Sequence, residues 1–157
     1  MVEVSAAKYD ITPEFPMYMR GYAMRTGKSI GVLDRLYCRA LCLRVDGEIF
    51  VWVTLEELIS DYVRGVVAAK YSVPVEHVIL STIHTHSGPD ISFEDEGEDR
   101  NRRKADYRSF LVNRVLAAVD ECFDRGFLEV TPSVVQGTIE GVYGNRNYKD
   151  KPSDKDV

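Results

Sequence analysis

The feature that most constrains this chain is an apolar run, residues 78–83, that ends abruptly in the hexad His84–Pro89. The run reads Val-Ile-Leu-Ser-Thr-Ile. A β-branched and nearly continuous apolar stretch of this kind is typical of a strand buried on both faces of a parallel sheet. Gly88 and Pro89 end the run. The sequence therefore predicts an α/β fold with a buried strand over residues 78–83.

The hexad contains two of the three histidines of the chain, His84 and His86. In an extended chain, residues two apart point to the same side, so both imidazoles would lie on one side and Thr85 on the other. Open α/β sheets bind ligands just beyond the carboxyl ends of their strands, and the histidines lie at such an end. The pattern indicates a metal or catalytic site. The alternative is a polar turn that only ends the strand.

Composition sets limits on the architecture and on the partners. With 157 residues, of which 45% are hydrophobic and 29% charged, the chain is predicted to form a single α/β domain over residues 1–157, with a frayed tail at 144–157. The net charge of −5 disfavours nucleic acid and anionic membrane surfaces as partners. Neither a transmembrane segment nor a signal peptide is recognisable, which predicts a cytoplasmic location, with secretion of a processed form as the alternative.

The cysteines indicate whether disulfides or a cysteine metal site stabilise the fold. Cys38, Cys42 and Cys122 are odd in number and lie within apolar patterns. They are therefore predicted to be reduced core residues, without a disulfide framework or a Cys-x-x-Cys metal site.

The middle of the chain predicts a hairpin followed by a crossover. Two alternating segments, 37–45 and 48–53, are joined by Asp46-Gly47, a strong hairpin signal. Residues 54–57, Thr-Leu-Glu-Glu, match a capping box, so a helix is expected from Thr54 to about Tyr71. Strand, helix and strand over this distance imply a parallel pair with a right-handed crossover. We therefore expect a mixed β-sheet with an antiparallel hairpin, right-handed β-α-β crossovers and helices packed on the sheet.

Further elements follow from periodicity and turn residues. Residues 2–8 and 133–139 read as strands, and apolar residues at helical spacing over 107–123, closed by Gly126, predict a second amphipathic helix. Residues 17–33 lack periodicity and read as a long ordered loop. The acidic and then basic residues over 90–104 predict a solvated, mobile excursion. Its functional alternative is a lid beside the hexad.

Several short motifs resemble the amino-terminal domain of the neutral/alkaline, non-lysosomal ceramidase family, and they occur in that family's order. The resemblance covers almost the whole chain, and the hexad is its most specific element. Members of the family are zinc amidohydrolases that cut an N-acyl sphingosine into a fatty acid and a sphingoid base. The matching residues are Asp10–Pro13, Arg20–Tyr22, Asp34–Ala40, His84–Pro89 and Gly144–Arg146.

The resemblance implies roles for individual residues around one zinc ion. His84 matches the zinc-binding first histidine of the family's hexad. His86 matches the second, catalytic histidine beside the metal-bound water, and Arg146 matches a catalytic arginine near the scissile carbonyl. Gly21 and Tyr22, with Asp10, are expected to shape loops near the site. Without the resemblance, Arg146 would read as a solvated arginine near a frayed terminus.

The zinc site is expected to be incomplete within these residues. A catalytic zinc takes three protein ligands and keeps one open position. By resemblance, the family takes its remaining ligands, a histidine, a glutamate and a tyrosine, from sequence beyond residue 157. Glu56 is the best local candidate, and its alternative role is to stabilise the first turn of a helix. His77 is a poor substitute for the missing histidine ligand. It lies at the start of the strand, just before Val78, about 20 Å from His84 in an extended chain.

The sequence thus predicts a zinc-dependent amide hydrolase of ceramidase type in an incomplete or truncated form, inactive alone, with a lipid or small amide as substrate. The alternative is a non-enzymatic α/β module that binds metal weakly or binds a partner through residues 17–33. Surfaces that a missing region would cover predict self-association as a homo-oligomer.

Overall fold

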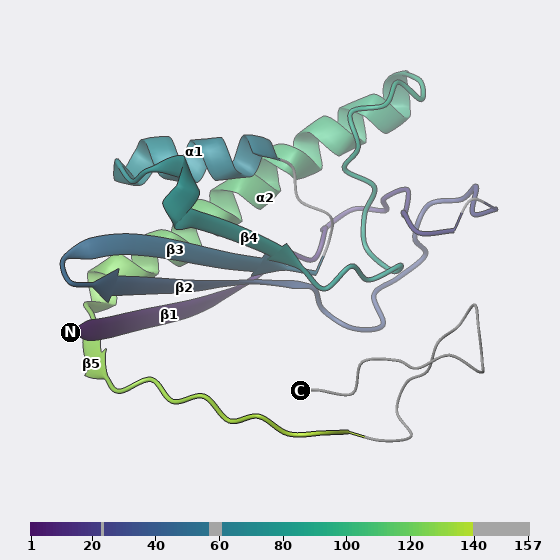
Figure 1. Cartoon of the computed structure of the whole chain (residues 1–157). Coiled ribbons are helices and arrows are strands. Elements are labelled where there is room, and N and C mark those ends of the chain that lie inside the picture. The colour runs from purple at the N-terminus through teal and green to yellow at the C-terminus, as the bar shows by residue number, and fades with distance from the viewer. Residues whose placement is uncertain (23, 57–60, 140–157) are drawn as a thin grey trace.

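The computed structural model describes residues 1–22, 24–56 and 61–139, so Arg146 and the tail expected at 144–157 lie outside the described residues. Figure 1 shows the elements in the described part of the chain. They are β1 (Val2–Asp10), β2 (Tyr37–Val45), β3 (Glu48–Leu55), α1 (Asp61–Tyr71), η1 (Val75–His77), β4 (Val78–Thr82), α2 (Glu98–Arg125) and β5 (Leu128–Val130).

The strands form one mixed sheet in the order β4-β3-β2-β1-β5. β3 and β4 are parallel, and the other neighbouring pairs are antiparallel. The expected hairpin between β2 and β3 is confirmed: Asp46 and Gly47 both have positive φ, 49° and 92°, as a tight two-residue turn between twisted strands requires. β1, β3 and β4 therefore run in the same direction and end at the same edge of the sheet.

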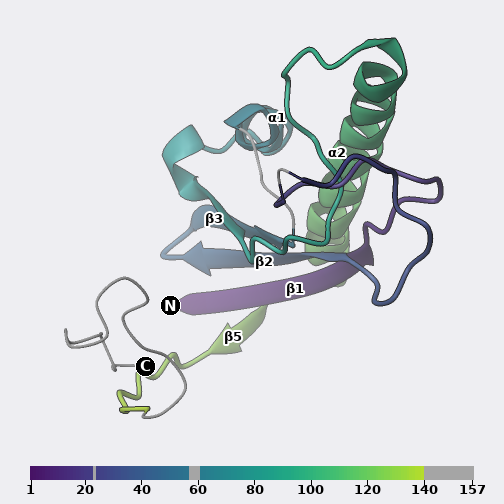
Figure 2. The same ribbon diagram turned by 90° about the vertical axis from the view of Figure 1, so that its right-hand side faces the viewer.

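Both helices cover the same face of the sheet, as Figures 1 and 2 show from two directions. Alternate residues of the strands point into this layer, while the stripe of α2 at helical spacing faces them. The expected packing of helices on the sheet is confirmed, and so are the buried, free cysteines. The core residues include Cys38, Ala40, Cys42, Val51, Val53, Leu55, Val67, Tyr107, Leu111, Val115, Val119 and Cys122.

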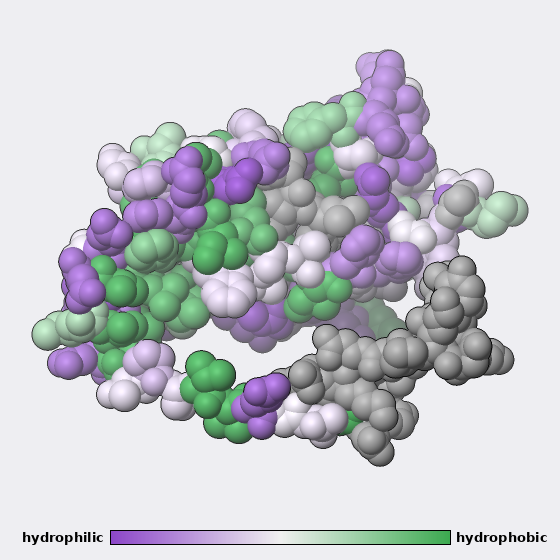
Figure 3. All heavy atoms as spheres, in the orientation of Figure 1, coloured by the Kyte–Doolittle hydropathy of each residue, from purple (hydrophilic) through white to green (hydrophobic). Residues whose placement is uncertain are grey.

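The opposite face of the sheet carries no helix of the described chain (Figure 2). One apolar row crosses it, because Leu41 pairs with Ala6 and Trp52, and Trp52 pairs with Ile79. Trp52 and Ile79 remain 43% and 44% exposed. Figure 3 shows hydrophobic residues gathered over β3 and β4 and hydrophilic residues over the first turns of α2.

The environment expected for the 78–83 strand is wrong in one respect. β4 is an edge strand that ends at Thr82, and its buried residue is Val78, whereas Ile79 is exposed. The continuous apolar run misled the prediction because Ile79 faces the side of the sheet without helices. The apolar character of the run nevertheless fits the exposed row described above.

The expected capping box at 54–57 is also wrong. Thr54 lies inside β3, and its hydroxyl hydrogen-bonds to the Ser81 hydroxyl at 2.7 Å. Parallel pairing with β4 extends β3 to Leu55, which pairs with Thr82, and this tertiary pairing outweighs the local capping signal. The helix begins at Asp61 in the described chain, and residues 57–60 lie outside the described residues.

The last expected strand is misplaced. β5 is formed by Leu128–Val130, which pairs with β1 through Val2 and Val130, and residues 133–139 form no strand. The free edge of β1 is therefore paired by the chain directly after Gly126, before the alternating segment begins. No helix in the described part of the chain is long and apolar enough to cross a membrane. The cytoplasmic location stays a prediction.

Candidate active site

β1, β3 and β4 end at one edge of the sheet, where the segments after β1 and β4 begin (Figure 1). Beyond Thr82, the hexad segment continues to pair with the chain after β3. The Ile83 amide donates to the Leu55 carbonyl at 2.8 Å, and the Thr85 amide donates to the Glu56 carbonyl at 3.1 Å. The hexad is therefore fixed at the carboxyl end of a parallel strand pair, where α/β folds place their ligands.

The two hexad histidines lie side by side, with ring centroids 5.2 Å apart and planes tilted by 44°. The extended backbone expected for them is wrong, because His84 has a φ of 58°. Its amide donates to the Thr82 hydroxyl at 3.0 Å, which turns the chain within one residue. A non-glycine residue in this left-handed region is uncommon and costs free energy, which marks a position held by its surroundings.

The loop before β2 lies against the second histidine. The Tyr22 ring meets the His86 ring edge-on, with centroids 5.2 Å apart and an interplanar angle of 86°. Gly21 packs so closely that a Cβ there would lie 2.5 Å from the Cβ of His86. The expectation that Gly21 and Tyr22 lie near the hexad therefore agrees with the geometry.

Asp10 shapes the start of the same loop. Its Oδ1 accepts the Thr12 amide at 2.8 Å, and the Thr12 hydroxyl accepts the Leu36 amide at 2.9 Å. Arg35 donates to the other carboxylate oxygen. Burial alone would raise the pKa of Asp10, but the hydrogen bonds from Thr12 and the Arg35 guanidinium hold it below its usual range. These contacts join the two ends of the loop.

Glu56 follows β3 at the same edge of the sheet, and both of its carboxylate oxygens already have donors. Oε2 accepts the Tyr37 amide at 3.0 Å, and Oε1 accepts Nη1 of Arg39 at 3.0 Å. The Glu56 side chain is 15% exposed. Its role as a metal ligand stays a prediction, and the Arg39 ion pair competes with that role.

A cavity of about 710 Å³ lies beside the hexad. Its lining includes Ile83 and the hexad residues Thr85 and Ser87 but neither histidine. His84 and His86 therefore do not line this cavity. Glu56 also lines the cavity. The remaining lining comes from Thr12–Met17, Met19, Ser29–Leu36, Gly88 and Pro89.

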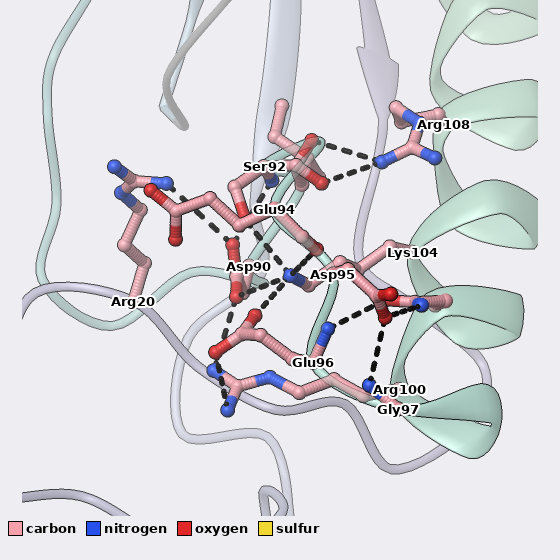
Figure 4. Close-up of polar contacts among 12 residues, drawn as sticks. Arg20, Asp90, Ser92, Glu94, Asp95, Glu96, Gly97, Arg100, Lys104 and Arg108 are labelled. Carbon is pink, nitrogen blue, oxygen red and sulfur yellow. Dashed lines mark hydrogen bonds and ion pairs between the residues drawn. The ribbon is translucent and has the colours of Figure 1, made fainter.

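The segment after the hexad is anchored at Asp90, Ser92 and Lys104, which corrects part of the expected solvated excursion over 90–104, while residues 93–98 are exposed. Glu98 begins α2, and Lys104, which is 1% exposed, lies in a polar cluster with Asp90. Its ammonium donates to the Ser92 hydroxyl at 2.8 Å and also pairs with Glu96. Figure 4 shows these side chains converging between the segment and the first turns of α2.

Asp90 is the central acceptor of this cluster (Figure 4). Its Oδ2 lies 3.0 Å from Arg100 and 3.3 Å from Lys104, and its Oδ1 accepts the Ser92 amide at 3.0 Å. Burial by itself raises the pKa of Asp90, but the hydrogen bonds from Ser92 and the charge of Lys104 outweigh it and lower the pKa to about 2. Compensated charges explain why a segment rich in charge is ordered here.

The described residues fit a zinc ion only in part. Two neighbouring histidines are suitable donors, yet no group of three or more His, Cys, Asp or Glu side chains that could hold a metal occurs in the described ranges. The third histidine is engaged elsewhere: Nδ1 of His77 lies 3.1 Å from the Ile49 carbonyl, and its ring stacks on Phe50 at 4.1 Å. The expected incomplete zinc site stays a prediction.

Sequence reasoning missed two features of the site. Lys104 precedes Tyr107 and Leu111 at helical spacing on the buried stripe of α2, so its position in the heptad-like pattern was a usable signal. Arg25 contacts the His86 backbone, and no local pattern marked it, because the contact spans 61 residues of sequence.

No family model matches this chain, and no curated protein matches it. Solved structures do match. The neutral ceramidase from Pseudomonas aeruginosa shares 23% identity with a TM-score of 0.59, over 77% of this chain and 21% of that one. A ceramidase complexed with C2 shares 22% identity with a TM-score of 0.66, over 93% of this chain and 24% of that one.

The fold of this chain is similar to that of one part of these ceramidase structures. The resemblance expected from the hexad and its companion motifs is thereby confirmed at the level of the fold. The chain spans less than a quarter of the length of either ceramidase structure. At 22% and 23% sequence identity, the similarity shows the fold alone. It does not show the activity, the zinc or the substrate of this chain.

Proposed function

We propose that this domain is part of a zinc-dependent amide hydrolase of neutral-ceramidase type. The observation that carries the proposal is the pair of His84 and His86 rings, 5.2 Å apart, at the carboxyl end of β4 in a ceramidase fold. The substrate class is an N-acyl sphingosine or a related N-acyl amide, and the products are a fatty acid and an amine.

Each proposed role follows from the chemistry of the side chain. His84 is proposed as a zinc ligand, and the zinc, when bound, supplies Lewis-acid activation for amide hydrolysis. His86 is proposed to face the reacting amide and to act as a general acid or base, a role that imidazoles commonly take in catalysis. The guanidinium of Arg146, outside the described residues, is proposed to donate hydrogen bonds to the carbonyl oxygen as negative charge develops there. The remaining zinc ligands are proposed to come from outside the described residues.

A titration with Zn²⁺ tests the first role and has a matched control in the chain. His84→Asn is expected to weaken Zn²⁺ binding at least about tenfold, since even residues that only support ligands are worth that much. His77→Asn removes the same imidazole at a position bonded to the Ile49 carbonyl and is expected to bind Zn²⁺ like the wild type. If His84→Asn binds Zn²⁺ as tightly as the wild type, the proposed site is wrong.

A second candidate is a non-enzymatic α/β module that keeps the fold and binds metal weakly. It is favoured by one observation: Glu56, the best carboxylate near the hexad, is already paired with Arg39. The two candidates differ in what elemental analysis and an amidase assay would find. Stoichiometric zinc together with hydrolysis of an N-acyl sphingosine that His86→Asn abolishes supports the hydrolase. Zinc-free protein without amidase activity supports the module only in a preparation that contains the other proposed zinc ligands, because the hydrolase candidate also needs ligands from outside the described residues.

We also propose that this chain self-associates through the uncovered sheet face. The row of Leu41, Trp52 and Ile79 presents apolar surface that no described helix covers. Contiguous apolar surface of this kind usually marks an interaction site in water.

A further inference from the structure

The loop that precedes β2 runs beside the hexad for several residues. The Asp90 amide donates to the Tyr18 carbonyl at 2.8 Å, and the Arg20 amide donates to the Gly88 carbonyl at 3.2 Å. Met19 and Pro89 form an isolated antiparallel bridge between these bonds. The two segments are thus joined by backbone contacts just after His86. These contacts place Gly21 and Tyr22, which follow Arg20, against the His86 side chain.

Gly21 makes the closest approach. A Cβ at this position would lie 2.5 Å from the Cβ and Cγ of His86 and 2.8 Å from its Cα, closer than carbon atoms approach without a bond. The φ of Gly21 is 109°, a conformation that other residues rarely adopt. The lack of space and the positive φ therefore both require glycine at position 21. The Gly21 backbone packs directly against the His86 side chain.

Arg25 ties this loop to the His86 backbone. Its Nη1 donates to the His86 carbonyl at 2.9 Å and to the Arg20 carbonyl at 3.1 Å. The guanidinium also lies 5.0 Å from the centre of the Tyr22 ring, which in turn meets the His86 ring edge-on. Charge-assisted hydrogen bonds to carbonyls are about twice as strong as neutral ones. Arg25 forms no ion pair among the residues that the structure describes, so these contacts account for its position.

We propose that Arg25 and Gly21 are positioning residues for His86. Arg25 fixes the backbone carbonyl of His86, while Gly21 and the Tyr22 edge fix the orientation of its ring. The inference rests on the proposed role of His86 in the reaction. Reacting groups need to be held within a fraction of an ångström, so such a clamp affects catalysis without touching the substrate.

The test follows the His86 ring itself by NMR of histidine-labelled protein. The three histidines give three sets of ring signals, which His77→Asn, His84→Asn and His86→Asn assign. Arg25→Met is expected to shift and broaden the His86 ring signals while the His77 signals stay in place. Arg25→Lys, which keeps the charge and an N–H donor, is expected to restore part of the shift. Arg102→Met, at an exposed arginine paired with Asp99, is the control that leaves all three histidines unchanged.

Unchanged His86 signals in Arg25→Met would overturn the inference. Gly21→Ala gives a second measurement, and it is expected to displace the same signals because the methyl group has no space. The NMR measurement requires neither zinc nor enzymatic activity. The positioning role of Arg25 and Gly21 and the proposed hydrolase function can therefore be refuted independently of each other. If Arg25→Met moves the His86 ring but His86→Asn leaves amide hydrolysis intact in an active preparation, the clamp stands and the proposed function of His86 falls.

Discussion

The ammonium of Lys104 lies 3.3 Å from the Asp90 carboxylate, and the two side chains are only 2% and 5% exposed. The pair connects Asp90, which lies four residues after His86, to Lys104 in the second turn of α2. Removing one partner of a buried pair leaves a charge without water or a counterion, which costs far more than the intact pair contributes. The pair therefore makes the path of the hexad segment dependent on α2.

The first prediction concerns the loss of this ammonium. Lys104→Met is expected to lower the free energy of unfolding by about 3 kcal/mol, at the low end for a broken buried pair, because Arg100 still lies 3.0 Å from Asp90. Urea denaturation measures the change. Lys70→Met is the matched control, since Lys70 pairs with Asp120 at 39% and 46% exposure, and it is expected to cost less than about 1 kcal/mol. Equal losses in both variants would contradict the buried role of Lys104.

The second prediction concerns the acid side of the stability curve. The pKa of Asp90 is lowered from its ordinary value of 3.8 to about 2, so the folded state favours the ionised carboxylate. This stabilisation is complete above about pH 4 and is lost as the pH falls toward 2, and the shift corresponds to about 2 kcal/mol. Unfolding of the wild type is expected to depend on pH more steeply than unfolding of Asp90→Asn across this interval.

Other groups around Asp90 titrate or carry charge, and the comparison with Asp90→Asn separates them. Lys104, Arg100 and Arg20 face the carboxylate, and Glu96 shares Lys104 and Arg100 with it. Glu96 is present in both proteins, so the difference between the two curves reports the change at Asp90. Parallel stability curves for the two proteins from pH 5 to pH 2 would mean that the pKa of Asp90 is not lowered.

Much of the architecture could be predicted because its causes are local. The Asp46-Gly47 turn accommodates the positive φ values that its hairpin needs, and Gly126 ends α2 where the apolar stripe ends. The hexad was recognised for similar reasons, since its two histidines and its Gly-Pro ending stand in consecutive positions. Patterns of this kind are readable because each residue's environment is set by its near neighbours.

The rest depends on contacts between distant segments. Thr54 carries a helix-capping signal, yet pairing of β3 with β4 keeps it in a strand. Lys104 belongs to a charged stretch, and only the return of the 90–96 segment supplies the partners that allow its burial. Likewise, the sequence does not show that Glu56 pairs with Arg39, because this contact depends on the pairing of β2 with β3.

The third prediction tests which role Glu56 has. Glu56→Gln is expected to lower the free energy of unfolding by about 2 kcal/mol, because the charged acceptor of the Tyr37 amide and the Arg39 guanidinium is lost. Zn²⁺ affinity is expected to stay within a factor of about 2, whereas loss of a ligand costs at least about tenfold. Calorimetric titration with Zn²⁺ beside urea denaturation measures both. Tenfold weaker zinc binding with unchanged stability would instead make Glu56 a ligand.

The fourth prediction concerns the uncovered sheet face. Trp52→Lys is expected to reduce self-association, because it places a charge in the middle of the row formed with Leu41 and Ile79. Sedimentation velocity over a range of protein concentrations measures the association. Ile79→Lys, on the edge strand β4, repeats the test at a position where a lysine disturbs the fold less. Tyr62→Lys changes an aromatic residue of similar exposure on α1, on the helix side of the sheet, and is expected to associate like the wild type. If Trp52→Lys and Ile79→Lys both associate as strongly as Tyr62→Lys, the contact between copies lies elsewhere on the molecule.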